Sequence, residues 1–296
     1  MTGRARTVTI LLAFAWLAAL VLAPFLVVAK ISLAEVVIGR PPFTALLEWG
    51  EGAMPPALRV NWGNYALLFG DALYLEAYLG SLRLAAIATA VALAIAVPLA
   101  HAMTRAPARW RPALLVLAIL PFWTSSLIRV YAWIGILGAD GPLNRILQWL
   151  GIIDAPLAIL NTDIGIVSGL VYSYLPFALL PVYASLVRID PALGEAAADL
   201  GCRPLKSFFR ITLPLALPGI LAAGLLVFIP AVGEFVVPDL MGGSDTLMIG
   251  KTLWTEFFTN RDWPLASAAT VLLVLLLVSP VVVLERRLFL RGEGRA

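Results

Sequence analysis

The sequence has few of the residues on which enzyme and metal chemistry depend. It contains one cysteine, Cys202, and one histidine, His101, among 296 residues. A single cysteine cannot form an intrachain disulfide, and a single histidine excludes a histidine-pair metal site or a histidine-based catalytic triad within one chain. We therefore expect no catalytic residues, no metal site and no cofactor bound by this chain.

Charged residues are also scarce. They make up 13% of the chain, against roughly a quarter in soluble domains. Hydrophobic residues make up 61%, and the mean hydropathy is +0.94. This composition excludes an ordinary soluble domain and indicates a single membrane domain over residues 1–296. The net charge of +3 does not indicate nucleic-acid binding, because the chain has no long Lys/Arg tract.

Long apolar runs predict membrane-spanning helices, because a lipid environment leaves backbone groups no partner outside a helix. The predicted spans cover about residues 8–29, 80–103, 113–137, 163–187, 214–236 and 265–284. The first run is too long for a typical cleaved signal peptide, so we expect an uncleaved anchor. On the fourth, Gly165, Gly169 and Ser173 form a stripe of small residues that predicts close helix packing. The predicted fold class is all-α integral membrane with six transmembrane helices.

The charges are distributed unequally between the loops. The N-terminus, loop 104–112, loop 188–213 and the C-terminus carry 13 basic and 5 acidic residues, whereas the rest carries 8 basic and 13 acidic. By the positive-inside rule, both termini and loop 188–213 face the cytoplasm. The acidic opposite face would attract cations, unless it is merely a solvated surface, and the charge balance does not separate these readings.

The most informative polar stretch is residues 190–214, DPALGEAAADLGCRPLKSFFRITLP, which lies between two apolar runs. Asp190 is a typical helix N-cap, and Gly201 tolerates the left-handed conformation that ends helices. Pro204 then favours the start of a second helix that runs toward Pro214. The sequence therefore predicts two short helices joined by a bend after Gly201.

This stretch resembles the loop of ABC-importer permeases that contacts the ATPase. That loop contains Glu-Ala-Ala, a glycine four positions after the last alanine and, after nine further residues, Ile-x-Leu-Pro. The same spacing is kept here by Glu195, Ala196, Ala197, Gly201, Ile211, Leu213 and Pro214. The resemblance implies the type I importer permease fold, with a cytoplasmic coupling helix, including Asp199, that docks into a groove on the ATPase. The Glu-Ala-Ala triplet alone would favour an ordinary capped interfacial helix.

Ionisable residues within predicted spans are costly and are candidates for function. Arg129 lies in the third span, and Glu234 lies toward the external end of the fifth, with Asp239 just beyond. Either Arg129 and Glu234 pair and hold helices together, or Glu234 and Asp239 receive a cation with help from aromatic faces. The available rings are those of Trp123, Tyr131, Trp133, Tyr172, Tyr174 and Phe228. Arg129 would repel a cation, so we assign it a gating or helix-pairing role.

Further runs give a narrower resemblance. They are LPFWTSSLIRVYAWIGIL (120–137), IPAVGEFVVPDLMGG (229–243) and LWTEFFTNRDWPLASA (253–268). These runs are similar to putrescine/spermidine ABC permeases, above all to the putrescine-type subunit. The resemblance implies a non-enzymatic bacterial inner-membrane subunit that imports polyamines. Its implied partners are a second similar permease, two copies of an ATPase that binds ATP and Mg, and a periplasmic polyamine-binding protein.

Other functions stay open at this point. A permease of the same family for another solute, such as sulfate, iron or an amino acid, is the main alternative. An anion carrier should place basic residues, not Glu234 and Asp239, in its cavity. An intramembrane enzyme would need paired carboxylates, a histidine cluster or a Ser/Lys dyad at span depth, and the sequence contains no such set. A membrane scaffold would have no evident use for the coupling loop.

Overall fold

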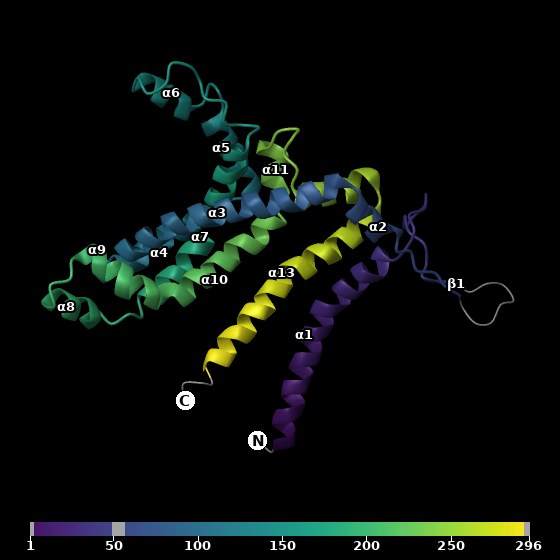
Figure 1. Ribbon diagram of the computed structural model, residues 1–296, viewed down its shortest axis with the longest axis horizontal. Helices are drawn as coiled ribbons and strands as arrows, with labels where there is room; N and C mark the ends of the chain where they lie inside the picture. Colours follow the sequence, from purple (N-terminus) through teal and green to yellow (C-terminus); the bar gives the residue numbers. More distant parts are fainter. Residues whose placement is uncertain (1–2, 49–56, 293–296) are drawn as a thin grey trace. The chain divides into compact units, whose positions relative to one another are not determined.

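The computed structural model describes residues 3–48 and 57–292, and these residues are almost entirely helical (Figure 1). Within them, five helices are long and apolar enough to cross a bilayer: Ile10–Ser32, Ala72–Arg105, Asp163–Leu186, Pro204–Val232 and Trp263–Pro280. A pair of helices, Arg111–Trp123 and Ser126–Trp149, makes a sixth span if it is counted as one. The predicted all-α membrane fold is therefore confirmed.

The chain forms two compact units, one from the described residues up to Leu75 and from Thr252 onward, the other from Glu76 to Lys251. The prediction of a single transmembrane domain stays a prediction. In the first unit, α1 (Gly3–Ser32) packs along α13 (Trp263–Gly292). The short helix α2 (Gly63–Gly70) also packs on α13. In the sequence between α1 and α2, β1 (Leu47–Glu48) and β2 (Ala57–Leu58) form one small antiparallel pair.

In the second unit, α7 (Asp163–Leu186) and α10 (Leu213–Val232) pack closely along their length, beside α3 (Ala72–Arg105). A ladder of alanines makes the close approach of α3 possible, because every fourth residue presents only a methyl group to the core. These fully buried residues are Ala88, Ala92, Ala96 and Ala100. The coupling-loop helices lie at one end of α7 and α10, and α5 and α11 lie at the other (Figure 1).

The segment 113–137, predicted as one continuous span, is instead broken. It consists of α4 (Arg111–Ile119), a 3₁₀ turn over Leu120–Trp123 and α5 (Ser126–Leu137), and the chain bends by 92° at the break. Pro121 and the extended backbone of Thr124 interrupt the helical hydrogen bonds, and the Thr124 hydroxyl donates to the Pro121 carbonyl at 2.7 Å. The break was hidden because Thr-Ser-Ser lowers the hydropathy of an apolar window only slightly. After α5 the short helix α6 (Pro142–Trp149) follows.

The stripe of small residues on α7 marks a close contact, as predicted. A Cβ atom placed on Gly169 would lie 2.9 Å from both the Sδ atom of Met241 and the Cγ1 atom of Val237. Both neighbours belong to α11 (Val236–Met241). The remaining short elements of the described chain are α8, α9 and a π-type turn in the coupling loop, and α12 (Ile249–Trp254) with a second π-type turn (Thr255–Asn260).

Candidate functional site

The polar stretch after α7 forms a helix and a tight bend, which we call the coupling elbow (residues 190–203). Its helix is α8 (Ala192–Asp199). The Oδ1 atom of Asp190 accepts a hydrogen bond from the N–H of Ala192 at 2.9 Å, as a capping residue should. Gly201 has a φ of +75°, and its N–H and that of the next residue donate to carbonyls of α8 at 2.8 and 2.9 Å. These two bonds form a Schellman motif, so the predicted left-handed stop at Gly201 is confirmed.

The second predicted short helix is not a separate element. The helix that starts at α9 (Pro204–Ser207) passes through a π-type turn (Phe208–Thr212) and continues as α10 to Val232. Proline cannot donate a hydrogen bond, and its ring clashes with the carbonyl four residues earlier, so a widened turn just before Pro214 accommodates it. Leu213 and Pro214 therefore begin the transmembrane helix itself, directly joined to the elbow.

The residues of the Glu-Ala-Ala motif point in different directions on α8. Ala197 is 7% exposed and faces the interior. Ala196 and Asp199 are exposed, and Glu195, although also exposed to solvent, lines the cavity described below. Two leucines that the sequence analysis missed, Leu200 and Leu205, are 88% and 75% exposed. Large apolar side chains on a polar loop are the signal that could have identified them, because such residues are typical of protein contacts.

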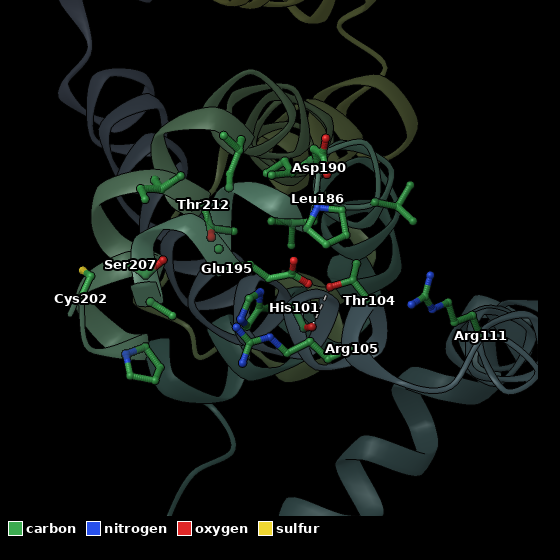
Figure 2. Close-up of a pocket in the computed structure, with 18 residues that line it drawn as sticks. His101, Thr104, Arg105, Arg111, Leu186, Asp190, Glu195, Cys202, Ser207 and Thr212 are labelled. Atoms are coloured by element: carbon green, nitrogen blue, oxygen red, sulfur yellow. Dashed lines mark hydrogen bonds between the residues drawn. The ribbon is translucent and has the colours of Figure 1, made fainter. Parts of the chain in front are cut away.

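A cavity of about 610 Å³ lies behind α8 (Figure 2). His101, Thr104 and Arg105 line it from the end of α3, and Glu195 lines it from α8. The ring of His101, on α3, lies 4.7 Å from that of Phe208, so this histidine packs against the coupling loop, as expected of a lone histidine near the end of a span. The cavity leaves α8 with few packed neighbours on this side.

At the other end of α10, Glu234 occupies a polar junction between α7, α10 and α11. Its Oε2 atom accepts a hydrogen bond from the hydroxyl of Tyr174 at 2.5 Å. Its Oε1 atom accepts one from the N–H of Val236 at 3.0 Å, at the start of α11, where a negative charge is favourable. The carboxylate is only partly exposed. Glu234 therefore joins two helices and still has free acceptor capacity, since a carboxylate offers about four lone-pair positions.

Arg129 and Glu234 do not pair in the described structure, which corrects one of the two readings from the sequence. The guanidinium of Arg129 lies 4.6 Å from the centroid of the Phe122 ring in a cation–π arrangement. Its Nε and Nη1 atoms are buried and have no acceptor among the described residues. If Arg129 holds helices together, as predicted, it does not do so by pairing with Glu234.

Aromatic rings nevertheless connect these two charged residues. Phe122 meets Phe177 edge to face at 5.0 Å, and Phe177 lies 6.2 Å from Tyr174, whose hydroxyl binds Glu234. We call Phe122, Phe177 and Tyr174 the aromatic string. Phe122 and Phe177 were not among the predicted site residues. Phe177 follows Tyr174 by three residues and so shares a helix face with it, which is the signal that could have identified it.

The other predicted pathway rings do not join this string. Trp133 and Tyr172 stack with their centroids 5.1 Å apart and their planes within 4°, and Trp133 Nε1 donates to Ser168 Oγ at 3.1 Å. This pair fastens α5 to α7. Trp123 and Tyr131 are 81% and 60% exposed, and Phe228 is half-buried on α10. The predicted cluster is therefore divided into a string, a stack and separate rings.

Asp239 forms an ion pair with a lysine of the same chain. Its Oδ1 atom lies 3.6 Å from the Nζ atom of Lys251. This ion pair neutralises the carboxylate and counts against its predicted role in receiving a cation. The pairing of Lys251 with Asp239 could not be predicted from the sequence, because the two residues lie on different helices.

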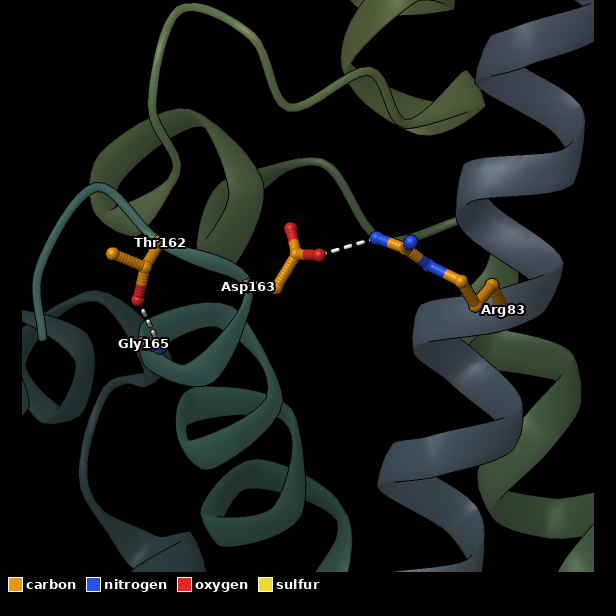
Figure 3. Close-up of polar contacts among 4 residues, drawn as sticks. All are labelled: Arg83, Thr162, Asp163 and Gly165. Atoms are coloured by element: carbon orange, nitrogen blue, oxygen red, sulfur yellow. Dashed lines mark hydrogen bonds and ion pairs between the residues drawn. The ribbon is translucent and has the colours of Figure 1, made fainter.

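A further ion pair ties α3 to the first turn of α7 (Figure 3). Arg83 of α3 pairs with Asp163, and the hydroxyl of Thr162 caps α7 by accepting from the N–H of Gly165 at 3.3 Å. Asp163 also suits this position because a negative charge is favourable at a helix N-terminus. Sequence reasoning could not pair Arg83 with Asp163, since 80 residues separate them.

Comparisons with known proteins agree with the membrane fold and identify the family. Residues 92–289 match the family model of the "binding-protein-dependent transport system inner membrane component". The chain is 39% identical over 286 residues to the spermidine/putrescine transport system permease protein PotB of Haemophilus influenzae, covering 97% of this chain and 95% of that protein. It is 45% identical over 214 residues to PotB of Escherichia coli strain K12, covering 72% and 78%.

The fold is also found in a solved structure. A crystal structure of a bacterial alginate ABC transporter, in complex with an alginate pentasaccharide-bound periplasmic protein, contains a chain with a TM-score of 0.68. That match covers 94% of this chain and 91% of that chain at 17% identity, so it shows the fold alone. Together with the family model, it establishes that the chain belongs to the binding-protein-dependent transport system inner membrane components, the permease subunits of ABC importers.

Proposed function

We propose that this chain is a permease subunit that imports polyamines, putrescine or spermidine, in an ATP-driven transporter. Support comes from relatives named as permeases of a spermidine/putrescine transport system. At the site, the observation that carries the proposal is the partly exposed Glu234 carboxylate, held by Tyr174 at the end of the aromatic string. A carboxylate beside aromatic faces suits a substrate with ammonium groups.

The coupling elbow would transmit the energy of ATP hydrolysis to this site. A separate ATPase, in two copies, would grip Glu195, Ala196, Asp199 and Gly201 from the cytoplasm. The helix from Pro204 to Val232 then acts as one rod of 29 residues, about 43 Å long at 1.5 Å per residue. Its far end lies two residues before Glu234. A shift of the elbow therefore moves the substrate site directly.

The rest of the assembly follows from the family and from loop charge. A second, similar permease would complete the cavity, and a periplasmic polyamine-binding protein would deliver substrate from the outer side. The basic loops and both termini would face the cytoplasm of a bacterial inner membrane.

Uptake by the reconstituted complex tests this proposal. Vesicles containing the complex are supplied with labelled putrescine, spermidine or sulfate, with and without ATP on the ATPase side. We expect ATP-dependent uptake of a polyamine and none of sulfate. Polyamine uptake at full rate without the ATPase, or uptake of sulfate alone, would contradict it.

A second candidate function, import of an anion, is favoured by one observation. Two buried nitrogen atoms of Arg129 have no acceptor within the described residues, and an anionic solute would supply one. The same assay separates the candidates, because Arg129→Gln should abolish uptake by an anion carrier. Glu234→Gln should have the larger effect in a polyamine carrier.

A further inference from the structure

Residues 35–44 form a hairpin in the first unit. Val36 and Phe43 face each other in an antiparallel bridge, and the ends are tied because Thr44 N–H donates to the Glu35 carbonyl at 3.0 Å. The tip carries Ile38, whose side chain is fully exposed, followed by Gly39 and Arg40. The ordered hairpin therefore presents one large apolar side chain at its tip.

The hairpin packs against aromatic residues at and just before the start of α13. Phe43 lies 6.0 Å from Trp263, which stacks on Phe257 with centroids 4.7 Å apart and planes within 6°. Between the hairpin tip and these rings lies a cavity of about 420 Å³. We call it the arginine–aromatic socket, and its lining includes Arg40, Pro42, Phe257, Phe258, Arg261 and Trp263.

The backbone conformation of Arg261 is unusual, and hydrogen bonds hold it in place. Its φ is +55°, in the left-handed region that non-glycine residues seldom occupy. The N–H groups of Arg261 and Asp262 both donate to the carbonyl of Glu256, so the backbone is held in this strained form. This left-handed residue caps the π-type turn and so fixes where the Arg261 side chain leaves the backbone. Neither Arg40 nor Arg261, both exposed, has an acidic partner within the part of the chain that the structure describes.

The chemistry of the socket selects an acidic partner. Two arginines presented beside apolar rings attract carboxylates, and arginine binds them with two parallel hydrogen bonds. The same arginines repel a polyamine, so the socket is not a second substrate site. The two arginines also differ from their surroundings in the sign of their charge. The external segments and the spans together carry 8 basic and 13 acidic residues.

We propose that the socket and Ile38 dock an acidic surface segment of the periplasmic binding protein, the partner that the family requires. This rests on the sidedness given under the proposed function, which places residues 35–44 and 255–263 outside. Carboxylates of the binding protein would pair with Arg40 and Arg261, and Ile38 would be buried against its surface. The socket would then set the orientation in which the binding protein releases substrate.

The test uses the full complex, with its ATPase and second permease, in lipid nanodiscs. The probe is the cognate periplasmic binding protein loaded with putrescine, and the readouts are its affinity and its stimulation of ATP hydrolysis. Arg40→Glu with Arg261→Glu should weaken binding by about tenfold or more, since like charges then oppose each other. Ile38→Ser alone should weaken it by roughly threefold. The control is Arg145→Glu, an exposed arginine on α6, which should bind as the wild type does.

Rescue and lipid dependence make the outcome decisive. Replacing the facing carboxylates of the binding protein by lysine should restore affinity for the Arg40→Glu, Arg261→Glu complex. Unchanged affinity in that complex would overturn the proposal. A defect that depends on the phosphatidylglycerol content of the nanodisc, with unchanged affinity for the binding protein, would also overturn it and assign the socket to a lipid headgroup. If the wild type binds the protein through the socket but imports no polyamine, the proposed function fails and the docking site stands.

Discussion

At the scale of single residues, Glu234 has a structural role beside the substrate role that we propose for it. It receives hydrogen bonds from Tyr174 and from the N-terminus of α11, so removing the whole side chain would loosen the junction of α7, α10 and α11. An ammonium group could still approach the free lone pairs without breaking either bond. A substitution that keeps the shape of the side chain and removes its charge and one acceptor is therefore the informative one.

We expect Glu234→Gln to lower putrescine uptake by about tenfold, because a hydrogen bond to a charged group contributes roughly 1.5–3 kcal/mol. Insertion and assembly should be largely unchanged, since the amide oxygen still accepts from Tyr174 and the one bond lost is that from the Val236 N–H. Uptake by vesicles at matched protein levels measures this. Asp239→Asn is the matched control, because Lys251 already neutralises that carboxylate. Equal losses from both substitutions would count against a special role for Glu234.

Gly201 is required for its backbone conformation and not for lack of space. Its φ is +75°, yet a Cβ atom there would meet nothing within 4 Å. Gly201→Val should therefore cost about 1–2 kcal/mol in the elbow and lower the ratio of solute imported to ATP hydrolysed. Gly201→Asn should stay close to wild type, because asparagine tolerates this conformation.

Gly194, also in open space but helical, provides the control for the elbow. Gly194→Ala should leave coupling unchanged and favour α8. If Gly201→Val couples as well as Gly194→Ala does, the left-handed stop has no part in transmission.

At the scale of elements, the close contact between α7 and α10 determines whether the rod moves alone. A Cβ atom on Gly219 would lie 2.3 Å from the Cβ of Ser185 and 2.9 Å from the carbonyl oxygen of Pro181. Backbone lies on one side of this contact, so a side chain there cannot be accommodated by a rotamer change. The two helices are therefore expected to move together, as one pair.

Gly219→Val should destabilise the complex by about 1–3 kcal/mol through overpacking. The apparent midpoint of thermal unfolding in detergent measures the loss. Gly224→Ala on the same helix is the control, because its new methyl would make ordinary contacts at 3.6 Å with Leu93 and 3.9 Å with Thr89. A wild-type midpoint for Gly219→Val would show that α7 and α10 are not packed this closely.

At the scale of the whole molecule, the asymmetry of charge predicts the orientation in the membrane. Cys202, the single cysteine, is half-buried at the elbow, and Ile38 is exposed at the hairpin tip. A membrane-impermeant maleimide should label Cys202 in inverted vesicles and not in intact spheroplasts. In a Cys202→Ser background, Ile38→Cys should show the reverse. Labelling of Cys202 from outside would invert the assignment and with it the docking proposal.

Much of the fold and the elbow could be predicted because the causes are local. An apolar run in lipid has to become a helix, so five of the expected spans appear as long helices near their predicted positions. The stop at Gly201 depends on one residue and its neighbours, and the spacing of Glu195, Ala196 and Ala197 to Pro214 is visible in the chain itself. The exposure of Leu200 was missed because it depends on what the fold leaves uncovered.

The sequence by itself determined that this protein is a helical membrane protein, since hydropathy acts along the chain, and the spacing within residues 190–214 carried its resemblance to importer permeases. Only the tertiary structure decided which charges meet. It separated Arg129 from Glu234, gave Asp239 to Lys251 and joined Arg83 to Asp163, because pairing depends on distances between helices far apart in sequence. It also merged the predicted second short helix with α10 and broke the predicted third span, since proline and hydroxyl side chains change hydrogen bonds in ways that hydropathy does not record.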